Sequence, residues 1–132
     1  QALDALRSGE IVGIFPEATI SRSFTVKDVK SGAVRLAAEA GVPLLPTAVW
    51  GTQRLWTKGR PKSLTQRHVP ITIIVGEPIE PTTDAALRER MQDLLDDTQA
   101  RYPESGEGQW WQPAHLGGTA PTPEEAKRLD DR

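Results

Sequence analysis

The chain contains no cysteine among its 132 residues. Disulfide bridges, thiolate nucleophiles and thiolate metal sites are therefore excluded. The sequence also lacks an apolar run near the roughly 18 to 20 residues that a membrane-spanning helix needs, and it shows no signal-peptide pattern. Zinc-ligand spacings and Gly-rich phosphate loops are missing as well. Any membrane contact is expected to be peripheral, or to come from a part of the protein outside this sequence.

Apolar residues are also few, at 37% of the chain, and the last third is especially poor in them because Pro, Gly, Glu and Asp accumulate there. We therefore expect residues 1–102 to supply the core of a domain. Residues 103–132 are expected to form an irregular tail attached through Trp110 and Trp111, and the last ten residues of this tail are expected to be either a short helix or disordered. The chain begins at Gln1 within what reads as a helix already under way, so we expect an N-terminal part of the domain to precede it.

The net charge of −2 hides an uneven distribution. Residues 20–67 carry nine Lys or Arg against two acids, a net charge of +7, whereas residues 69–132 carry six bases against thirteen acids, a net charge of −7. A basic segment of this kind is typical of a surface that meets an anionic partner such as a phosphate ester, a membrane or a nucleic acid. A set of solvated basic loops without a partner is an equally acceptable interpretation.

The apolar pattern of the first fifty residues indicates an α/β fold with a largely parallel sheet and flanking helices. Residues 10–15 and 44–51 are short apolar runs that read as buried strands. Between them, Ser31 can cap a helix that Gly41 ends. A strand, a helix and a second strand in this order predict a right-handed crossover between parallel strands.

Two more elements are expected further along the chain. Residues 69–79 are rich in β-branched side chains and read as a strand, and a long helix should begin at Thr82 or Thr83 and end before Pro103. Ligands of parallel sheets gather at the carboxyl ends of the strands. The loops after Phe15 and Trp50 lie at such ends and are therefore the places to look for a site.

The first of these loops carries the stretch GIFPEATISRS, residues 13–23. Pro16 fixes its own φ and stiffens the exit from the expected strand. The Glu17 carboxylate can accept hydrogen bonds from a ligand hydroxyl or from N–H groups of the loop, and the Thr19 hydroxyl can donate to a phosphate oxygen. The alternative is that Glu17 merely caps the loop, and spacing alone slightly favours this alternative. Positive charge for a phosphate would come from the basic residues that follow: Arg22, Lys27 and Lys30.

Two blocks of the sequence stand in an informative order and separation. Phe15 to Ser21 read FPEATIS, and after Lys-Ser-Gly and a helical segment Val42 to Thr47 read VPLLPT. They resemble the Phe-Pro-Glu-Gly-Thr-Arg-Ser and Val-Pro-Ile-x-Pro-Val blocks of the glycerolipid acyltransferase family, the 1-acylglycerol-3-phosphate acyltransferases that turn lysophosphatidate into phosphatidate. The resemblance covers about residues 1–80 and implies the C-terminal part of a glycerol-3-phosphate acyltransferase-like domain.

The resemblance also implies which residues bind the acceptor, although two positions depart from the family pattern. Ala18 replaces a glycine, so the backbone there cannot adopt positive φ freely, and Ile20 replaces the arginine that binds phosphate. Arg22 lies two residues further on and is our candidate substitute for that arginine. The acceptor-binding residues implied in this way are Phe15, Pro16, Glu17, Ala18, Thr19, Arg22 and Lys30.

Catalysis in the family rests on a histidine and an aspartate with four residues between them, the histidine acting as general base on the acceptor hydroxyl. Neither histidine of this chain has that partner, because Ile73 stands five residues after His68 and Ala120 stands five residues after His115. We therefore expect no catalytic residue and no metal ligand in this chain. The pair should lie upstream, and the 132 residues alone should be inactive.

The implied reaction is attack of the hydroxyl of lysophosphatidate, or a similar lysophospholipid acceptor, on the thioester of acyl-CoA or acyl-carrier protein. No cofactor is expected beyond this co-substrate, and no nucleic acid. The resemblance further implies a place at the cytoplasmic face of the cell membrane, peripheral or anchored by the upstream part. Trp56, in a basic and turn-rich loop, is a candidate for contact with the membrane surface, whereas Trp50 is expected to pack in the core.

Two other classes of function stay open at this point. One is a non-catalytic module that binds phosphate or another anion through the basic segment 20–67. Nucleic acid is a weaker form of this alternative, because only Phe24, Trp50 and Trp56 are available for stacking on bases. The other class is an acyltransferase-like scaffold that acts through partner proteins.

Overall fold

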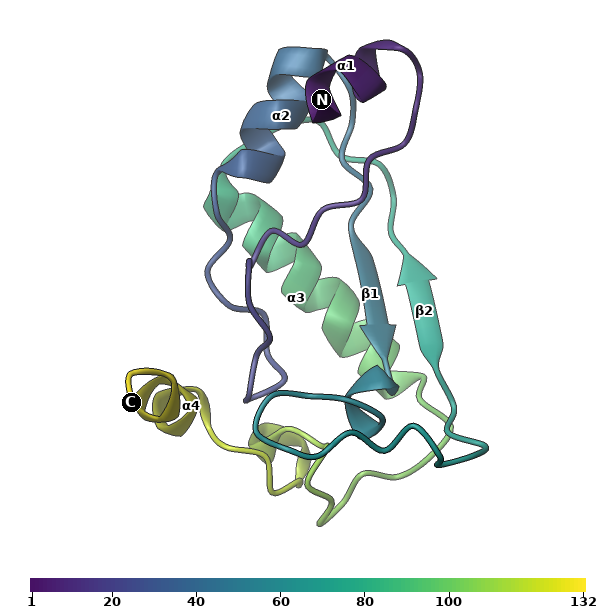
Figure 1. Ribbon diagram of the computed structural model, residues 1–132, viewed down its shortest axis with the longest axis vertical. Helices are drawn as coiled ribbons and strands as arrows, with labels where there is room; N and C mark the ends of the chain where they lie inside the picture. The colour runs from purple at the N-terminus through teal and green to yellow at the C-terminus, as the bar shows by residue number, and fades with distance from the viewer.

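The structure is a computed structural model that describes all 132 residues. Two helices lie at one end of the molecule, and the loops that follow the first strand gather at the other end with the C-terminal residues (Figure 1). None of the helices combines the length and apolar character needed to cross a bilayer. In chain order the elements are α1 (Ala2–Arg7), α2 (Gly32–Ala40), β1 (Thr47–Trp50), the 3-10 helix η1 (Thr52–Arg54), β2 (Thr72–Val75), α3 (Asp84–Ala100), the 3-10 helix η2 (Ala114–Leu116) and α4 (Pro123–Asp130).

Local signals in the sequence set the ends of the two longest helices, α2 and α3. α2 follows Ser31 and ends at Gly41, whose φ of 67° lies in the left-handed region that glycine adopts without strain. α3 begins after Thr83, whose side chain accepts a hydrogen bond from the N–H of Ala86. The expected starts and ends of these helices are confirmed.

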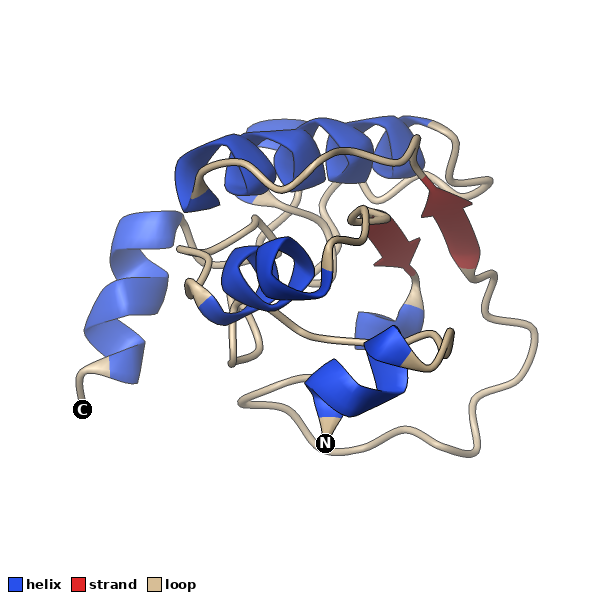
Figure 2. Cartoon of the chain, turned by 90° about the horizontal axis from the view of Figure 1, so that it is seen from above, coloured by secondary structure: helices blue, strands red, loops and turns tan.

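The sheet consists of β1 and β2, which pair antiparallel with Thr47 opposite Val75 and Trp50 opposite Thr72. An isolated bridge between Leu44 and Ile79 continues this pairing beyond the strands. Figure 2 shows α3 running along one side of the two strands, where Ala48 and Trp50 are buried. Ile73 and Val75 alternate with the covered residues, and both are 61% exposed.

The α/β class is confirmed, but the expected parallel pairing is wrong for the strands that form. Residues 10–15 are not a buried strand: Ile11 is 93% exposed, Phe15 is 92% exposed, and no backbone hydrogen bond joins this segment to a strand. A cavity of about 770 Å³, lined by Ile14 and Leu45 among others, separates the segment from the residues before β1. Its N–H and C=O groups therefore have no strand within reach, and an apolar run alone does not make a strand.

The core forms where α2 and α3 meet. Ala33, Val34 and Leu87 are buried against one another, and Met91 of α3 packs at their border. Trp50 is buried as expected, and its ring makes an edge-to-face contact with Phe24, with the centroids 6.0 Å apart. This contact links the loop after residue 15 to the end of β1.

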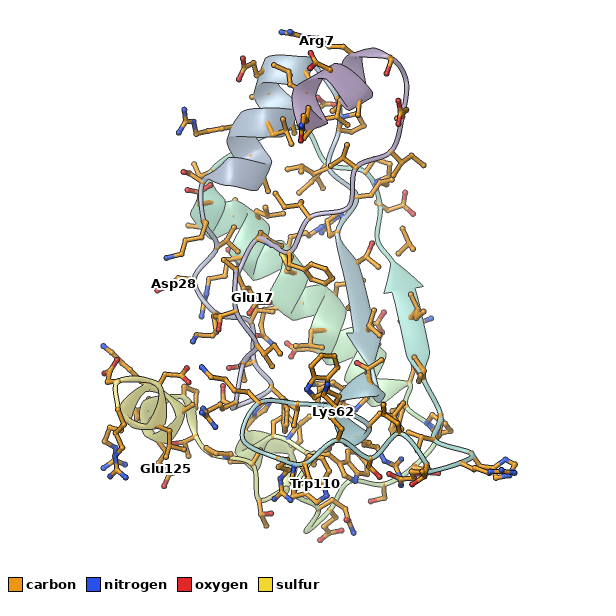
Figure 3. All side chains as sticks on the ribbon, viewed as in Figure 1. Arg7, Glu17, Asp28, Lys62, Trp110 and Glu125 are labelled. Carbon is orange, nitrogen blue, oxygen red and sulfur yellow. The ribbon has the colours of Figure 1, made fainter.

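The C-terminal tail is more ordered than its composition indicates. Trp111 is buried, with the Arg54 guanidinium 4.7 Å from its ring centroid, and the Arg60 guanidinium lies 4.0 Å from the centroid of Trp110. Lys62 and Trp110 both lie at the end of the molecule where the loops after β1 gather (Figure 3). The last residues form α4, which is the short helix expected as one of two possibilities for the last ten residues, and Ala114–Leu116 of the part expected to be irregular form η2. The division of the chain at residue 102 stays a prediction.

We expect Leu87→Ala to lower the free energy of unfolding by about 2 to 4 kcal/mol, because it leaves a cavity between α2 and α3. The matched control is Ile73→Ala, which removes the same number of carbon atoms from the exposed face of β2 and should cost less than about 1 kcal/mol. Urea unfolding followed by circular dichroism measures both. Equal losses in the two variants would contradict the assignment of the core.

Candidate functional site

Two hydrogen bonds close the loop between residues 16 and 30. The N–H of Lys30 donates to the carbonyl oxygen of Pro16 at 2.8 Å, which joins the two ends of the loop. Inside it, the N–H of Lys27 donates to Oε2 of Glu17 at 2.7 Å. The loop therefore has a fixed shape, although it contains no helix or strand.

The same loop is attached to α3 through Val26, which is buried. The N–H of Val26 donates to Oε1 of Gln92 at 2.8 Å, and its carbonyl oxygen accepts from Nη2 of Arg88 at 3.2 Å. Nε of Arg88 also lies 3.7 Å from the carboxylate of Asp28. Figure 3 shows Glu17 and Asp28 on the loop beside α3. One buried residue with both backbone groups bonded thus fixes the loop on the helix.

Burial raises the pKa of Glu17 above its usual value. The hydrogen bond from the N–H of Lys27 and the positive charges of Lys27 and Arg88 act in the opposite direction, but they do not outweigh the loss of water. In the folded protein Glu17 is therefore primarily an acceptor that closes its own loop. One of its two carboxylate oxygens, Oε1, has no hydrogen-bond donor within the chain.

Ala18 adopts the backbone conformation that the family pattern assigns to glycine. Its φ is 56°, in the left-handed region where the Cβ atom of an ordinary residue is strained. Alanine adopts positive φ only with strain, as expected. The loop nevertheless keeps the left-handed conformation at residue 18, so Ala18 is strained and the loop shape is unchanged. The strain lies directly between Glu17 and Thr19.

Three cations from two loops meet one carboxylate of the C-terminal helix. Oδ1 of Asp130 accepts from Nε of Arg22 at 2.8 Å and from Nζ of Lys58 at 2.6 Å, and Oδ2 accepts from Nζ of Lys27 at 2.9 Å. Gly59, with a φ of 82°, lies so close to Arg22 that an added Cβ would stand 2.3 Å from Nη1. The loop after residue 15 and the loop after Trp50 therefore meet, although not at the ends of parallel strands as the sequence predicted.

The pKa of Asp130 is held well below its usual range by the hydrogen bonds from Lys58, Lys27 and Arg22. The carboxylate is consequently ionised throughout the neutral range and remains so in mildly acidic solution. Its side chain is 16% exposed, against 22% for Arg22. We name this group of Arg22, Lys27, Lys58 and Asp130 the cation cluster.

The sequence-predicted residues fall into two groups in the structure. Glu17 and Arg22 join networks that share Lys27, whereas the side chains of Thr19 and Lys30 are exposed and make no hydrogen bond within the chain. Phe15, Pro16 and Ala18 contribute the shape of the loop more than polar contacts. No group of three His, Asp or Glu side chains comes together in a way that could hold a metal ion.

Three contributors were not assigned to the site from the sequence: Arg88, Lys58 and Asp130. Arg88 and Asp130 are separated from the loop by more than fifty residues, and no short pattern connects them to it. Lys58 lies in the basic loop that also carries Trp56. The one signal for it was its position after the strand that ends at Trp50, because loops at strand ends converge.

Glu17→Ala should lower the free energy of unfolding by about 1 to 3 kcal/mol, since it leaves the N–H of Lys27 without a partner. Glu17→Gln keeps an acceptor and removes the charge. Because the folded pKa is raised, ionisation of Glu17 opposes folding, so its cost is absent below the unfolded pKa of about 4.3, grows as the pH rises from there to the folded pKa, and is constant above it. Denaturant unfolding should therefore favour Glu17→Gln over the parent increasingly as the pH rises from about 4, until the folded pKa is passed. A difference that stays constant with pH would contradict this account.

Ala18→Gly should raise the free energy of unfolding by about 0.5 to 1 kcal/mol, because relief of the left-handed strain exceeds the added entropy of the unfolded chain. Ala38→Gly, in the exposed part of α2, is the matched control and should lower it by about the same amount. Thermal unfolding of the two variants gives the comparison. Destabilisation by both substitutions would show that residue 18 is not strained.

Known proteins are similar to this chain in sequence. The model of the Acyltransferase family matches residues 1–50. A 1-acyl-sn-glycerol-3-phosphate acyltransferase of Bacillus subtilis (strain 168) is 34% identical over 104 residues, which are 75% of this chain and 46% of that protein. A protein of the same description from Chlamydomonas reinhardtii is 35% identical over 85 residues, 64% of this chain and 25% of that protein.

A solved structure agrees with the sequence matches. The crystal structure of the 1-acyl-sn-glycerophosphate acyltransferase PlsC from Thermotoga maritima superposes with a TM-score of 0.64 at 27% identity, over 78% of this chain and 44% of that chain. The chain thus spans between a quarter and a half of the length of these relatives. The family model, the relatives and the solved structure agree in supporting a place for this chain in the glycerolipid acyltransferase family.

Proposed function

We propose that the whole protein transfers a fatty acyl group to the hydroxyl of lysophosphatidate, or of a similar glycerophosphate acceptor, in phospholipid synthesis. The observation that carries the proposal is the Phe-Pro-Glu-x-Thr block at residues 15–19 standing next to a cluster of cations. A glycerophosphate presents a hydroxyl and a phosphate a few ångströms apart. A loop that offers carboxylate, hydroxyl and guanidinium groups in one short stretch suits both ends of such a ligand.

The acyl donor in this proposal is acyl-CoA or acyl-carrier protein. A general base takes the proton of the acceptor hydroxyl, the hydroxyl oxygen forms a bond to the thioester carbon, and the resulting oxyanion collapses. The carbon–sulfur bond then breaks, and the thiolate leaves and takes up a proton. Neither His68 nor His115 has an aspartate at the required spacing, so we place the base in sequence that precedes Gln1.

The acceptor-binding roles fall to residues of the loop. Arg22 binds the phosphate, because it is the cation nearest in sequence to the family's arginine position and its guanidinium is held at the edge of the loop. The free Oε1 of Glu17 and the hydroxyl of Thr19 are available to the glycerol. Lys30 adds long-range positive charge from an exposed position.

Membrane contact is a further part of the proposal. Trp56 is 59% exposed, and Nζ of Lys62 lies 4.0 Å from its ring centroid. Leu64, in the same loop, is also exposed. An exposed indole with an adjacent ammonium suits the interface of an anionic bilayer, so we propose peripheral attachment of this loop at the cytoplasmic face.

A second function remains tied to a specific observation. The convergence of three cations favours a non-catalytic module that binds phosphate through segment 20–67. The two proposals differ in one respect that can be tested: only an acyltransferase consumes the thioester.

The whole protein, expressed with its upstream sequence, should acylate lysophosphatidate, and Arg22→Ala should raise the KM for the acceptor about 10-fold or more, as expected for a lost charge-assisted contact. Glu17→Ala should also weaken acceptor use. Arg35→Ala, on the exposed side of α2, is the matched control and should leave the KM within about twofold. Release of free thiol from acyl-CoA measures the rate.

The 132-residue chain alone should give no transfer. Transfer by that chain, or unaltered acceptor kinetics in both Arg22→Ala and Glu17→Ala, would reject the assigned roles. A whole protein that binds lysophosphatidate but never releases thiol would support the binding module instead.

A further inference from the structure

The cation cluster has one feature that the proposed function does not use, namely its carboxylate. Asp130 comes from α4, more than a hundred residues away in sequence from Arg22 and Lys27. We infer that Arg22, Lys27 and Lys58 form one binding site for a phosphate monoester, and that Asp130 occupies this site as an internal substitute which α4 must withdraw before the ligand enters.

The charges of the cluster fit a phosphate better than they fit Asp130. Three positive groups meet one carboxylate, so the cluster keeps an excess of two positive charges. A phosphate monoester carries about −1.5 to −2 charges near neutral pH and offers three acceptor oxygens. Each of the three cations could then have an oxygen of its own, whereas Arg22 and Lys58 now share Oδ1 of Asp130.

The backbone around these cations is held in place without Asp130. The N–H of Lys27 is bonded to Glu17, and Gly59 packs against the guanidinium of Arg22. Ser23, buried next to Arg22, exchanges hydrogen bonds with Ser21 and Thr25 at 3.2 and 2.8 Å. The site therefore should persist when the carboxylate leaves, which distinguishes it from a surface ion pair that exists only through its partner.

α4 is built as a detachable element. Thr122 and Glu125 form a capping box, and Pro123 occupies the first turn, so the start of the helix is stabilised by its own residues. Only Ala126 of the helix is buried. With so little apolar contact, the hydrogen bonds of Asp130 are the main attachment of α4 to the loops.

This inference deepens the proposed function and rests on it in one respect, the identity of the phosphate as that of the acceptor. Anion binding itself needs neither the acyl donor nor the upstream sequence. It can therefore be measured on the chain directly, with sn-glycerol 3-phosphate as a soluble probe, inorganic phosphate as a second probe and glycerol as the uncharged comparison.

Asp130→Asn should tighten the binding of glycerol 3-phosphate by about 5- to 20-fold in isothermal titration calorimetry, because an occupied site becomes free. Asp131→Asn is the matched control: it removes the same charge from the next residue, which is exposed and contacts none of the cations, and it should change the affinity by less than about twofold. Arg22→Gln, added to Asp130→Asn, should abolish the gain. Glycerol should not bind to any variant.

Release of α4 is measured separately by amide hydrogen exchange. Saturation of the parent chain with glycerol 3-phosphate should accelerate exchange in residues 126–130 towards the rate of Asp130→Asn, and exchange at Leu87 should not change. Circular dichroism checks that each variant is folded. Equal binding of inorganic phosphate would support the site and assign recognition to the phosphate group alone.

Similar gains in Asp130→Asn and Asp131→Asn would overturn the inference, because bulk charge would then explain both. Unchanged exchange in α4 at saturation would overturn it as well. The proposed function fails independently: tighter phosphate binding in Asp130→Asn together with a whole protein that never acylates the acceptor would reject the enzyme and retain the site.

Discussion

The hydrogen bond from the N–H of Lys27 to the carboxylate of Glu17 spans ten residues and gives the loop after residue 15 its shape. Burial of the carboxylate raises the pKa of Glu17, although this hydrogen bond acts to lower it, and the bond leaves only one carboxylate oxygen for a ligand. The same bond fixes the backbone of Lys27, whose side chain then reaches the cation cluster. The sequence indicates a ligand-binding role for Glu17, but in the structure its carboxylate first holds the loop together. Its ligand-binding role therefore depends on the other groups that the loop places around it.

Much of the fold could be predicted because its signals are local. Thr83 and Gly41 mark helix ends through their own side chain or backbone, and such marks are visible in any sequence. The failure concerns residues 10–15, whose apolar character was correctly noted but whose pairing was not. A strand is defined by its neighbour, and a cavity of about 770 Å³ stands between this segment and the residues before β1. The composition of a segment indicates that it prefers burial, but it does not indicate which edge of a sheet is free to pair with it.

The candidate site was predictable to the extent that it lies within one stretch. The block from Phe15 to Thr19 and the substitute position of Arg22 can be read directly. The left-handed φ of Ala18 could not be predicted in this way, because alanine disfavours that conformation. Asp130 could not be found in this way, because it contacts Arg22 across 108 residues of sequence. Ion pairs between residues far apart in the sequence follow no rule of spacing, unlike the pairs three or four residues apart on a helix.

The charge asymmetry of the chain takes on a different meaning in the folded state. The net charge of +7 on residues 20–67 indicates an anionic partner for that segment. Part of this partner is the segment 69–132 of the same chain, which has a net charge of −7. Asp130 meets three of the nine cations and Glu104 meets Arg54, while Arg60 and Lys62 lie over indole rings. An external phosphate or headgroup therefore competes with carboxylates of the same chain, whose effective concentration is high. The cations with no acid or ring beside them are the ones left for long-range attraction of an anion: Lys30, Arg35 and Arg67.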